Sequence, residues 1–577
     1  MKAVRQIKRR EVQNNISWPN HLHPVVRRVY SQRPMARVHE IEHDLSLLHR
    51  PDSLGGLQQA INILQHALTH QKKILIVGDF DADGATSTAL AMRALRAMGA
   101  RHCAYMVPDR FKYGYGLTPE IVAAAMEQKP ELLITVDNGI SSIEGVAAAQ
   151  AQGVQVIVTD HHLPGAQLPA ADAIVNPNMQ DDAFPSKHLA GVGVVFYVMS
   201  ALRAALHANG WFERQGIAMP NMAQHLDLVA LGTVVDVVPL DHNNRILVEQ
   251  GLRRIQAGQC IPAISELLRL GKRTAAQCVA SDLGFAVGPR LNAAGRLEDM
   301  SLGIECLLSD DANRVAVVAQ ELDRLNSERR EIESEMREQA EQVMQQLLTT
   351  LDQTELPAAL SLYDPRWHQG VVGILASRIK DYSHRPVIAF AKVSDTQIKG
   401  SGRSVSGVHM RDALDAVATQ HPGLISKFGG HAMAAGLSVA LDQLPTFTEA
   451  FAAEVARRQP NGAGQAIVWS DGELSDNDIT LQTAELLQRA GPWGQAFPEP
   501  VFDGEFALLE KRIVGESHLK MTLQSTKSKQ TVAAIAFNET GENWDAARLR
   551  LAYRLEVNEF REQRTVQLNV QYIEPLD

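Results

Sequence analysis

Four aspartate-bearing segments occur in the first half of the chain, each where an apolar, strand-like run gives way to a loop. They are Asp79–Gly84, Asp137–Gly139, Asp160–His162 and Asp236. Because an open α/β sheet binds its ligands outside the carboxyl ends of its strands, these side chains are expected to meet at one sheet edge. Carboxylates gathered in this way repel one another unless divalent cations neutralise them. Oxygen ligands with one or two histidines favour Mn2+ or Mg2+ over a thiolate-binding metal.

The runs before the first three segments predict a parallel sheet. Ile74–Val77, Leu132–Val136 and Val156–Thr159 are apolar on both faces and rich in β-branched residues, as buried parallel strands are. Alanine-rich helical stretches alternate with the strands from about Lys73 to Leu240, which indicates a doubly wound sheet. The expected helices are Thr86–Met98, Glu120–Gln128 and Ser142–Gln152.

A long charged helix is expected further along the chain. Residues Asp311–Leu348 contain no proline or glycine and place apolar residues at helical spacing. At about 1.5 Å per residue this helix would be roughly 55 Å long, which exceeds most domains. We therefore expect it to bridge two lobes that have a cleft between them.

Two further folding units are expected after this helix. Between about Pro357 and Arg458, strands at Ala358–Tyr363 and Pro386–Lys392 flank a helix at Gly370–Lys380, which indicates a second, smaller α/β unit. After the turn-rich residues 459–464, short alternating strands predict a small barrel of the oligonucleotide-binding (OB) type. The expected barrel strands are Val501–Leu508, Leu519–Leu523, Val532–Phe537, Leu549–Glu556 and Val566–Ile573.

Composition sets broad limits on the class of protein. The chain of 577 residues is too long for one hydrophobic core, and 45% hydrophobic with 21% charged residues is ordinary for a soluble globular protein. No segment approaches the roughly 18 uninterrupted apolar residues of a membrane span, and no apolar stretch follows the basic N-terminus, so a cytoplasmic location is expected. The four cysteines are widely scattered and are expected to be reduced. The net charge of −10 does not exclude nucleic acid, because binding depends on local patches.

Several motifs resemble those of the DHH phosphoesterase superfamily, which is named for Asp160-His161-His162. More specifically, they resemble a family of bacterial 5′→3′ exonucleases that act on single-stranded DNA. The resemblance extends from about Leu75 to the C-terminus. The other motifs that carry it are Gly78–Gly84, Gly232–Leu240, Pro289–Arg296, Gly400–Ser404 and Phe428–His431.

The resemblance implies an α/β fold with a parallel-sheet DHH catalytic lobe, a long linking helix, a second smaller α/β lobe (the DHH-associated lobe) and a C-terminal OB-like β-barrel. Together these parts would ring a channel for single-stranded DNA. We divide the chain into an N-terminal basic arm with helices (1–70), a DHH catalytic domain (71–305), a connecting helix (306–350), a DHH-associated domain (351–460) and an OB-like nucleic-acid-binding domain (461–577).

Phosphodiester hydrolysis needs an activated water and a way to hold charge on the phosphate, which two cations about 3.5–4 Å apart can supply. Asp79 and Asp160 are expected either to bind Mn2+ or Mg2+ directly or to orient a neighbouring ligand. His162 is expected to touch the scissile phosphate or to protonate the departing 3′ oxygen. The predicted catalytic residues are Asp81, Asp83, His161 and His162, and the predicted metal residues are Asp79, Asp81, Asp83, Asp137, Asp160, His161 and Asp236.

Each of these residues also has a simpler interpretation. An isolated aspartate after a strand is usually a turn or helix-cap residue. Of two adjacent histidines, one usually lies in the core and the other in solvent. The metal site is preferred because four segments agree.

The second lobe is expected to supply positive charge. Arg403 lies in a glycine-rich segment, where a phosphate can approach the backbone closely. The resemblance implies that Arg110, Arg290, Ser401 and Arg403 form a pocket for the 5′ phosphate of DNA, and that His431 contacts a phosphate. A surface ion pair is the alternative for each arginine, and a turn cap is the alternative for His431.

Two further sets of residues are candidate contacts with DNA. Aromatic residues of the barrel either stack on bases or fill the barrel core. Basic residues near the N-terminus either follow the DNA backbone or form a solvated tail. The aromatic residues are Phe502, Phe506, Phe537, Tyr553 and Phe560, and the basic residues are Lys8, Arg9, Arg10, Arg27 and Arg28.

We therefore expect a Mn2+- or Mg2+-dependent exonuclease that degrades single-stranded DNA from its 5′ end to mononucleotides, in DNA repair and recombination. The resemblance implies a single-strand-binding protein and a helicase as partners, and we expect a monomer without membrane contact. A DHH phosphodiesterase for short RNA or cyclic dinucleotides and a non-catalytic replication scaffold are the alternatives. Residues Gln465–Asp577 disfavour the first, and the complete set of candidate ligands disfavours the second.

Overall fold

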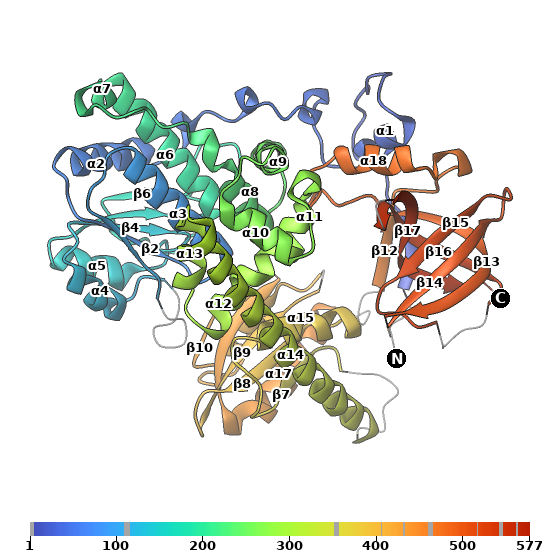
Figure 1. Cartoon of the computed structure of the whole chain (residues 1–577). Coiled ribbons are helices and arrows are strands. Elements are labelled where there is room, and N and C mark those ends of the chain that lie inside the picture. The colour runs from blue at the N-terminus through green and yellow to red at the C-terminus, as the bar shows by residue number, and fades with distance from the viewer. Residues whose placement is uncertain are drawn as a thin grey trace. The chain divides into compact units, whose positions relative to one another are not determined.

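The computed structural model describes residues 5–108, 116–350, 357–405, 407–430, 433–459, 466–515, 517–541, 546–560 and 563–576. The chain divides into two compact units. The smaller unit contains Met1–Lys8 and Ser327–Trp469, and the larger unit contains Arg9–Asn326 and Ser470–Asp577. Figure 1 shows the helices and strands of both units along the chain.

The larger unit contains a sheet with the strand order β3-β2-β4-β5-β6, in which every neighbouring pair is parallel. Gly78 pairs with Val136, and Val136 pairs with Thr159, so the three central strands end level with one another. The residue that follows each of these strands is one of the predicted aspartates, which confirms the expected sheet edge. The strands are β2 (Ile74–Gly78), β3 (Cys103–Met106), β4 (Leu132–Val136), β5 (Gln155–Thr159) and β6 (Ala173–Val175).

Helices cover both faces of this sheet. Ile74 and Ile76 of β2 belong to one core with α2, α3 and α6, whereas Leu75 and Val77 belong to a second core with α4 and α5. The runs are apolar on both faces for this reason, and the predicted doubly wound fold is confirmed. These helices are α2 (Leu57–Thr69), α3 (Ala82–Ala97), α4 (Pro119–Ala125), α5 (Ile143–Ala151) and α6 (Gly191–Ala208).

Among the described helices, α6 alone has the length and apolar composition of a membrane span, with a mean hydropathy of 1.4. Its residues Gly191–Met199 are all buried within the unit. Helix α6 packs against α3 and α8, so its apolar character is that of a central core helix.

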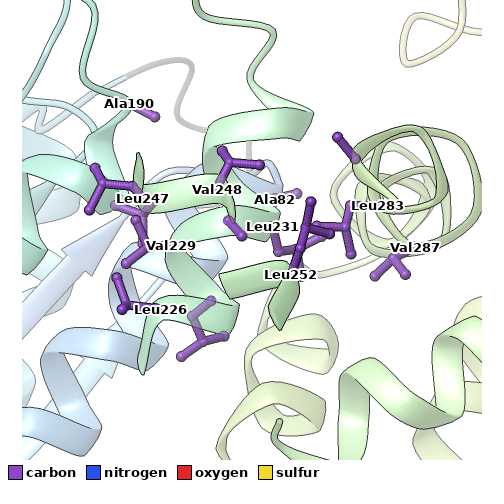
Figure 2. Close-up of a cluster of buried hydrophobic side chains, with 14 of the residues drawn as sticks. Ala82, Ala190, Leu226, Val229, Leu231, Leu247, Val248, Leu252, Leu283 and Val287 are labelled. Atoms are coloured by element: carbon purple, nitrogen blue, oxygen red, sulfur yellow. The ribbon is translucent and has the colours of Figure 1, made fainter. Parts of the chain in front are cut away.

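Asp236 is carried by a helix. The residues before it form α8 (Leu226–Val235), and Asp236 follows the last turn, so the expectation of a strand-like run at this position is wrong. Leu226–Thr233 is buried on every side, and an apolar run of this length does not distinguish a buried helix from a buried strand. Figure 2 shows α8 residues in a core with residues of α9 (His242–Gln256) and of the π-helical turn η7 (Leu283–Val287).

Shorter elements complete this part of the larger unit. They are α1 (Pro24–Ser31), η1 (Val38–Ile41), η2 (Leu45–Leu47), η3 (Pro51–Ser53), η4 (Met126–Gln128), α7 (Trp211–Gln215), η5 (Met222–His225), α10 (Pro262–Leu270), η6 (Ala275–Gln277), α11 (Ala280–Asp282), α12 (Gly288–Leu297) and α13 (Ser301–Leu308).

The C-terminal residues of the larger unit form a closed barrel with the order β13-β14-β15-β17-β16. The pair β15 and β17 is parallel and the other pairs are antiparallel. Each of the predicted barrel strands is present, so the OB-like barrel is confirmed. The elements are η9 (Asp476–Asp478), α18 (Leu481–Arg489), β13 (Phe502–Val514), β14 (His518–Ser525), β15 (Thr531–Ala536), β16 (Arg548–Phe560) and β17 (Gln563–Pro575).

Basic residues near the N-terminus pack onto this C-terminal region. Arg9 donates to both carboxylate oxygens of Asp503, at 2.8 to 3.2 Å. The guanidinium of Arg28 lies 5.8 Å from the centre of the Phe502 ring. Arg9 and Arg28 therefore contact the barrel, and for these two residues the alternative of a solvated tail is wrong.

The smaller unit contains a sheet with the order β10-β11-β9-β8-β7, in which β7 and β8 are parallel and the other pairs are antiparallel. This is the expected second α/β unit. Its elements are β7 (Leu360–Tyr363), α15 (Val372–Ser383), β8 (Val387–Lys392), β9 (Gln397–Arg403), α16 (Met410–Gln420), β10 (Lys427–Gly430), β11 (Ala434–Ala440), η8 (Leu441–Gln443) and α17 (Leu444–Arg458), and β1 (Arg5–Arg9) pairs with β12 (Ala466–Ser470).

The expected long helix is present as α14 (Ala312–Thr350). Its first part belongs to the larger unit, and the division between the units falls between Asn326 and Ser327. Val315, Val318 and Leu322 are buried in the core of the larger unit, which explains the apolar residues at helical spacing.

Candidate metal centre

The loop after β2 places two aspartates at the start of α3. Asp81 is the N-cap of α3, and its Oδ1 accepts hydrogen bonds from the backbone N–H groups of Asp83 at 2.9 Å and Gly84 at 3.1 Å. The N–H groups of a first helical turn have no partner within the helix, so the cap stabilises α3 and fixes the Asp81 carboxylate. Asp81 is therefore both a helix cap and a member of the site.

Asp83 lies against the N-terminus of α6. Its Oδ2 accepts from the N–H of Gly191 at 2.6 Å, and its Oδ1 accepts from the N–H of Val192 at 2.9 Å. A methyl group on Gly191 would lie 2.6 Å from the Asp137 Cβ, so only glycine permits this approach. The start of α6 thus holds Asp83 and leaves space for Asp137.

Asp137 adopts a left-handed backbone conformation, with φ of 61°. This conformation is unfavourable for a residue other than glycine, and such strain is concentrated at functional sites. The amide of the next residue, Asn138, donates to the carbonyl oxygens of Val77 at 3.1 Å and Val136 at 2.9 Å. Asn138 thereby links the ends of β2 and β4 and fixes the turn that presents Asp137.

His161 connects the strand ends to α8. Its Nε2 lies 3.1 Å from Asp137 Oδ1 and 3.5 Å from Asp236 Oδ2. Val237, directly after Asp236, also has a left-handed backbone, with φ of 61°. Two of the site's aspartates therefore lie at or beside strained positions.

Asp160 orients the histidine pair. Its Oδ1 accepts from the backbone N–H of His161 at 2.7 Å and lies 2.7 Å from His162 Nδ1, and its Oδ2 accepts from the N–H of Ile140 at 2.9 Å. Burial alone would raise the pKa of Asp160, but the hydrogen bond and charge of His162 hold it below its usual value. Burial likewise opposes protonation of His162, but Asp160 raises the His162 pKa.

The other carboxylates experience the opposite effect. Burial, together with the charge of neighbouring aspartates, raises the pKa of Asp83, Asp137 and Asp236. A divalent cation would offset both effects on the pKa, since it favours the charged form of every carboxylate around it.

Within the described part of the chain, three groups of possible metal ligands overlap through shared members. In each group, the ligand atoms lie within 4.8 Å of one another. Asp137 belongs to two groups, and His161 also belongs to two. Asp160 is in none of them. The groups are Asp79, Asp81 and Asp137; Asp83, His161 and Asp236; and Asp137, His161 and His162.

Sequence reasoning did not identify the role of Gly191 or of Asn138. The available signals were the glycines in Gly191-Val192-Gly193 at the start of an apolar run, and the position of Asn138 directly after a candidate ligand. Neither signal reveals which carboxylate or which strand the residue contacts, because those partners are distant in sequence.

Ser401 and Arg403 lie together in the smaller unit. Arg403 Nη1 donates to Ser401 Oγ at 3.1 Å and to the Gly402 carbonyl at 2.8 Å. A methyl group on Gly373, in the first turn of α15, would lie 3.0 Å from both Arg403 Nη2 and Ser401 Oγ. Burial lowers the pKa of Arg403. A guanidinium, a hydroxyl and a helix N-terminus therefore meet at one place, as in an anion site.

Of the remaining predicted phosphate contacts, the structure describes Arg290 alone. Arg290, in the larger unit, forms an ion pair with Asp323, at 2.8 Å from Nη2 to Oδ1. Arg110 and His431 lie outside the described residues.

The barrel aromatics whose side chains the structure describes divide into core and surface residues, and the side chain of Phe560 lies outside them. Phe502, Phe506 and Tyr553 are buried, so for these three the core interpretation applies. Phe537 is 52% exposed and packs its ring edge-on against His518.

The level ends of three parallel strands, with aspartates on each and a paired histidine on the third, define a phosphoesterase of the DHH class. Three family models match successive parts of the chain: the DHH family N-terminal domain at residues 73–233, the DHHA1 domain at 356–457 and the RecJ OB domain at 470–572.

Relatives of known structure or curated function match nearly the whole chain. The "Single-stranded-DNA-specific exonuclease RecJ" of Dickeya dadantii is 55% identical, with all of both chains covered. The structure of Thermus thermophilus RecJ in complex with Mn2+ has a TM-score of 0.78 at 30% identity, and covers 97% of this chain and 80% of its own. A complex of the same protein with Mg2+ has a TM-score of 0.72 at 28% identity, and covers 97% and 79%. The chain belongs to the RecJ family of single-stranded-DNA-specific exonucleases.

Proposed function

We propose that this chain is a single-stranded-DNA-specific 5′→3′ exonuclease that hydrolyses phosphodiester bonds to release 5′-mononucleotides. It uses two Mn2+ or Mg2+ ions and acts in DNA repair and recombination. The observation that carries the proposal is the set of three overlapping ligand groups at the carboxyl edge of the parallel sheet, in a member of the RecJ family.

The donor set fits these metals. The ligand atoms are carboxylate oxygens with imidazole nitrogens, which suit Mn2+ and Mg2+. Burial, and then repulsion among the carboxylates, raises the pKa of Asp83, Asp137 and Asp236, and bound cations would offset both effects. When bound, the two ions would supply an activated water and neutralise charge on the phosphate.

The protein's own groups hold this arrangement and move a proton. The N-cap bonds fix Asp81, and the N-terminus of α6 fixes Asp83, so both carboxylates are oriented before substrate binds. Asp160 acts as an orienting residue. Its oxygens accept hydrogen bonds from the backbone N–H groups of Ile140 and His161, and these bonds fix the backbone beside the metal-ligand candidates. His162, whose pKa is raised by Asp160 against the effect of burial, donates a proton to the departing 3′ oxygen.

Polarity follows from recognition of the 5′ phosphate. Ser401, Arg403 and the N-terminus of α15 bind this phosphate. Family resemblance assigns Arg110 and Arg290 to the 5′ phosphate as well, and His431 to contact with a phosphate of the DNA. The division of the chain at residues 70, 305, 350 and 460 is proposed on the same basis. A single-strand-binding protein and a helicase are the proposed partners of a monomeric, cytoplasmic enzyme.

The test compares Asp81→Ala and His161→Ala with Asp52→Ala, an exposed aspartate of the same unit. Both site variants should lose hydrolysis of 5′-phosphorylated single-stranded DNA with Mn2+, because each removes a metal ligand, while binding of the DNA in EDTA is retained. The control should behave as the unmodified protein. Normal digestion by either site variant contradicts the assigned site, and faster cleavage of two- to five-residue RNA than of long DNA favours the short-RNA phosphodiesterase.

A further inference from the structure

Helix α12 contacts the loop that carries the first metal-ligand candidates. The side-chain oxygen Oδ1 of Asn292 accepts a hydrogen bond from the backbone N–H of Ala82 at 2.8 Å. Ala82 lies between Asp81 and Asp83 and begins α3. Asn292 belongs to the Pro289–Arg296 motif, and the mechanism above gives it no role.

Asn292 completes the cap of α3. Asp81 Oδ1 accepts from the N–H groups of Asp83 and Gly84, and Asn292 accepts from the N–H group immediately before them. A helix start leaves its first N–H groups without partners in the helix. The side chains of Asp81 and Asn292 together accept hydrogen bonds from three of these groups. Asn292 therefore allows Asp81 to keep its orientation toward the site while it caps the helix.

A second contact holds the other side of Asp81. A methyl group on Gly295 would lie 1.8 Å from the carbonyl oxygen of Phe80, so the backbone of α12 touches the loop there. Asn292 and Gly295 thus hold the residues immediately after and before Asp81, which limits movement of its carboxylate.

Helix α12 is itself held at its first turn. Arg290 Nε and Nη2 lie 2.9 and 2.8 Å from Asp323 Oδ1 on α14. Arg290 also donates to the carbonyl oxygens of Ala286 at 2.6 Å and Leu270 at 3.2 Å. The loop that presents Asp81 is therefore connected through α12 to the part of α14 that belongs to the larger unit.

We propose that Asn292 is a positioning residue for the metal centre: its side-chain oxygen fixes the Ala82 backbone and so sets the Asp81 and Asp83 carboxylates for cation binding. The inference rests on the proposed function of those two aspartates. Removal of a residue that orients metal ligands weakens metal binding by roughly 10- to 100-fold, more than a distant change of similar size.

The experiment measures Mn2+ binding directly, by electron paramagnetic resonance of free Mn2+ during titration without DNA. Asn292→Leu keeps the side-chain size but loses the acceptor, Asn292→Asp keeps an acceptor, and Asn313→Leu changes an exposed asparagine at the start of α14. We expect Mn2+ affinity to fall about tenfold in N292L and to stay near normal in N292D and N313L. Repeating the titration at about 0.5 M salt screens the added charge of N292D.

Thermal unfolding in EDTA accompanies each titration, so that loss of folding is recognised. If N292L is unstable, Asn292→Ser, whose hydroxyl is too short to reach the Ala82 N–H, makes the same comparison. Unchanged Mn2+ affinity in N292L, or equal losses in N292L and N292D at high salt, would overturn the positioning role. Asp81→Ala is included as a reference. If D81A binds Mn2+ with normal affinity, the proposed metal site is wrong. If D81A loses Mn2+ affinity while N292L keeps it, only the positioning role of Asn292 is rejected.

Discussion

Arg33 and Asp471 form a buried ion pair, although they lie 438 residues apart in the chain. Arg33 Nη1 is 2.6 Å from Asp471 Oδ1, and Nη2 is 3.1 Å from Oδ2. Arg33 also donates to the carbonyl oxygen of Pro498, and Asp471 accepts from the N–H of Val501. The pair joins the N-terminal segment to the chain that enters the barrel.

Breaking this pair should destabilise the larger unit. Arg33→Met leaves the buried Asp471 carboxylate with Arg10 as its remaining cation, whose Nε lies 3.7 Å from Oδ1. We therefore expect unfolding in urea to require about 3 kcal/mol less free energy, at the low end for a broken buried pair. The double variant R33M/D471L should recover part of this loss, because both charges are then absent. Arg269→Met, which removes an exposed ion pair with Glu266, serves as the control and should be without measurable effect. If the urea midpoint of unfolding were the same for R33M and for the control, the buried pair would make no contribution to stability.

Arg403→Ala should impair cleavage of 5′-phosphorylated DNA more than cleavage of 5′-hydroxyl DNA. The guanidinium lies beside Ser401 and the first turn of α15, so its loss removes charge from the proposed phosphate pocket. Steady-state kinetics on the two substrates measure the difference, which we expect to be on the order of tenfold in kcat/KM, as for loss of a charge-assisted hydrogen bond. Exposed Arg411→Ala in the same unit is the control. Equal losses on both substrates would remove the pocket from the mechanism.

Metal binding should release protons. Burial and neighbouring carboxylates raise the pKa of Asp83, Asp137 and Asp236 in the metal-free protein. Because these pKa values are raised, the contribution of the groups to metal-free stability is present below their unfolded pKa and is lost as pH rises through the folded values. Mn2+ should therefore bind more tightly, and stabilise the fold more, as pH rises from acid to neutral. Titration calorimetry in buffers of different ionisation enthalpy measures the released protons, and identical heats in all buffers would be the contrary result.

His225 should make the larger unit sensitive to acid. Burial lowers its pKa to about 4, from 6.5 in the unfolded chain. With a depressed folded pKa, the unfolded state binds the proton first, so stability present above pH 6.5 is lost as pH falls toward 4. This contribution is on the order of 3 kcal/mol. Urea unfolding of His225→Phe should show a flatter decline over that range than the unmodified protein. If the free energy of unfolding declined in parallel for both proteins, the acid sensitivity would arise from groups other than His225.

The strands before Asp79, Asp137 and Asp160 could be predicted because runs that are apolar on both faces are the signature of a parallel sheet covered by helices. The barrel strands could be predicted because alternation along a strand is a local pattern. The run before Asp236 was wrongly predicted as a strand. Helix α8 is buried on every side, and such burial removes the periodicity that distinguishes a helix from a strand.

The sequence by itself determined the chemistry of this protein, since the types and order of its aspartates and histidines specify hard-metal ligands, most of them at the ends of strands. Tertiary structure alone decided which backbone groups hold those ligands. The N-terminus of α6 orients Asp83, Asn292 fixes Ala82, and Arg290 binds Asp323. These contacts join residues distant in the chain, and a hydrogen bond depends on distance and direction in space, which no local pattern of residue types records.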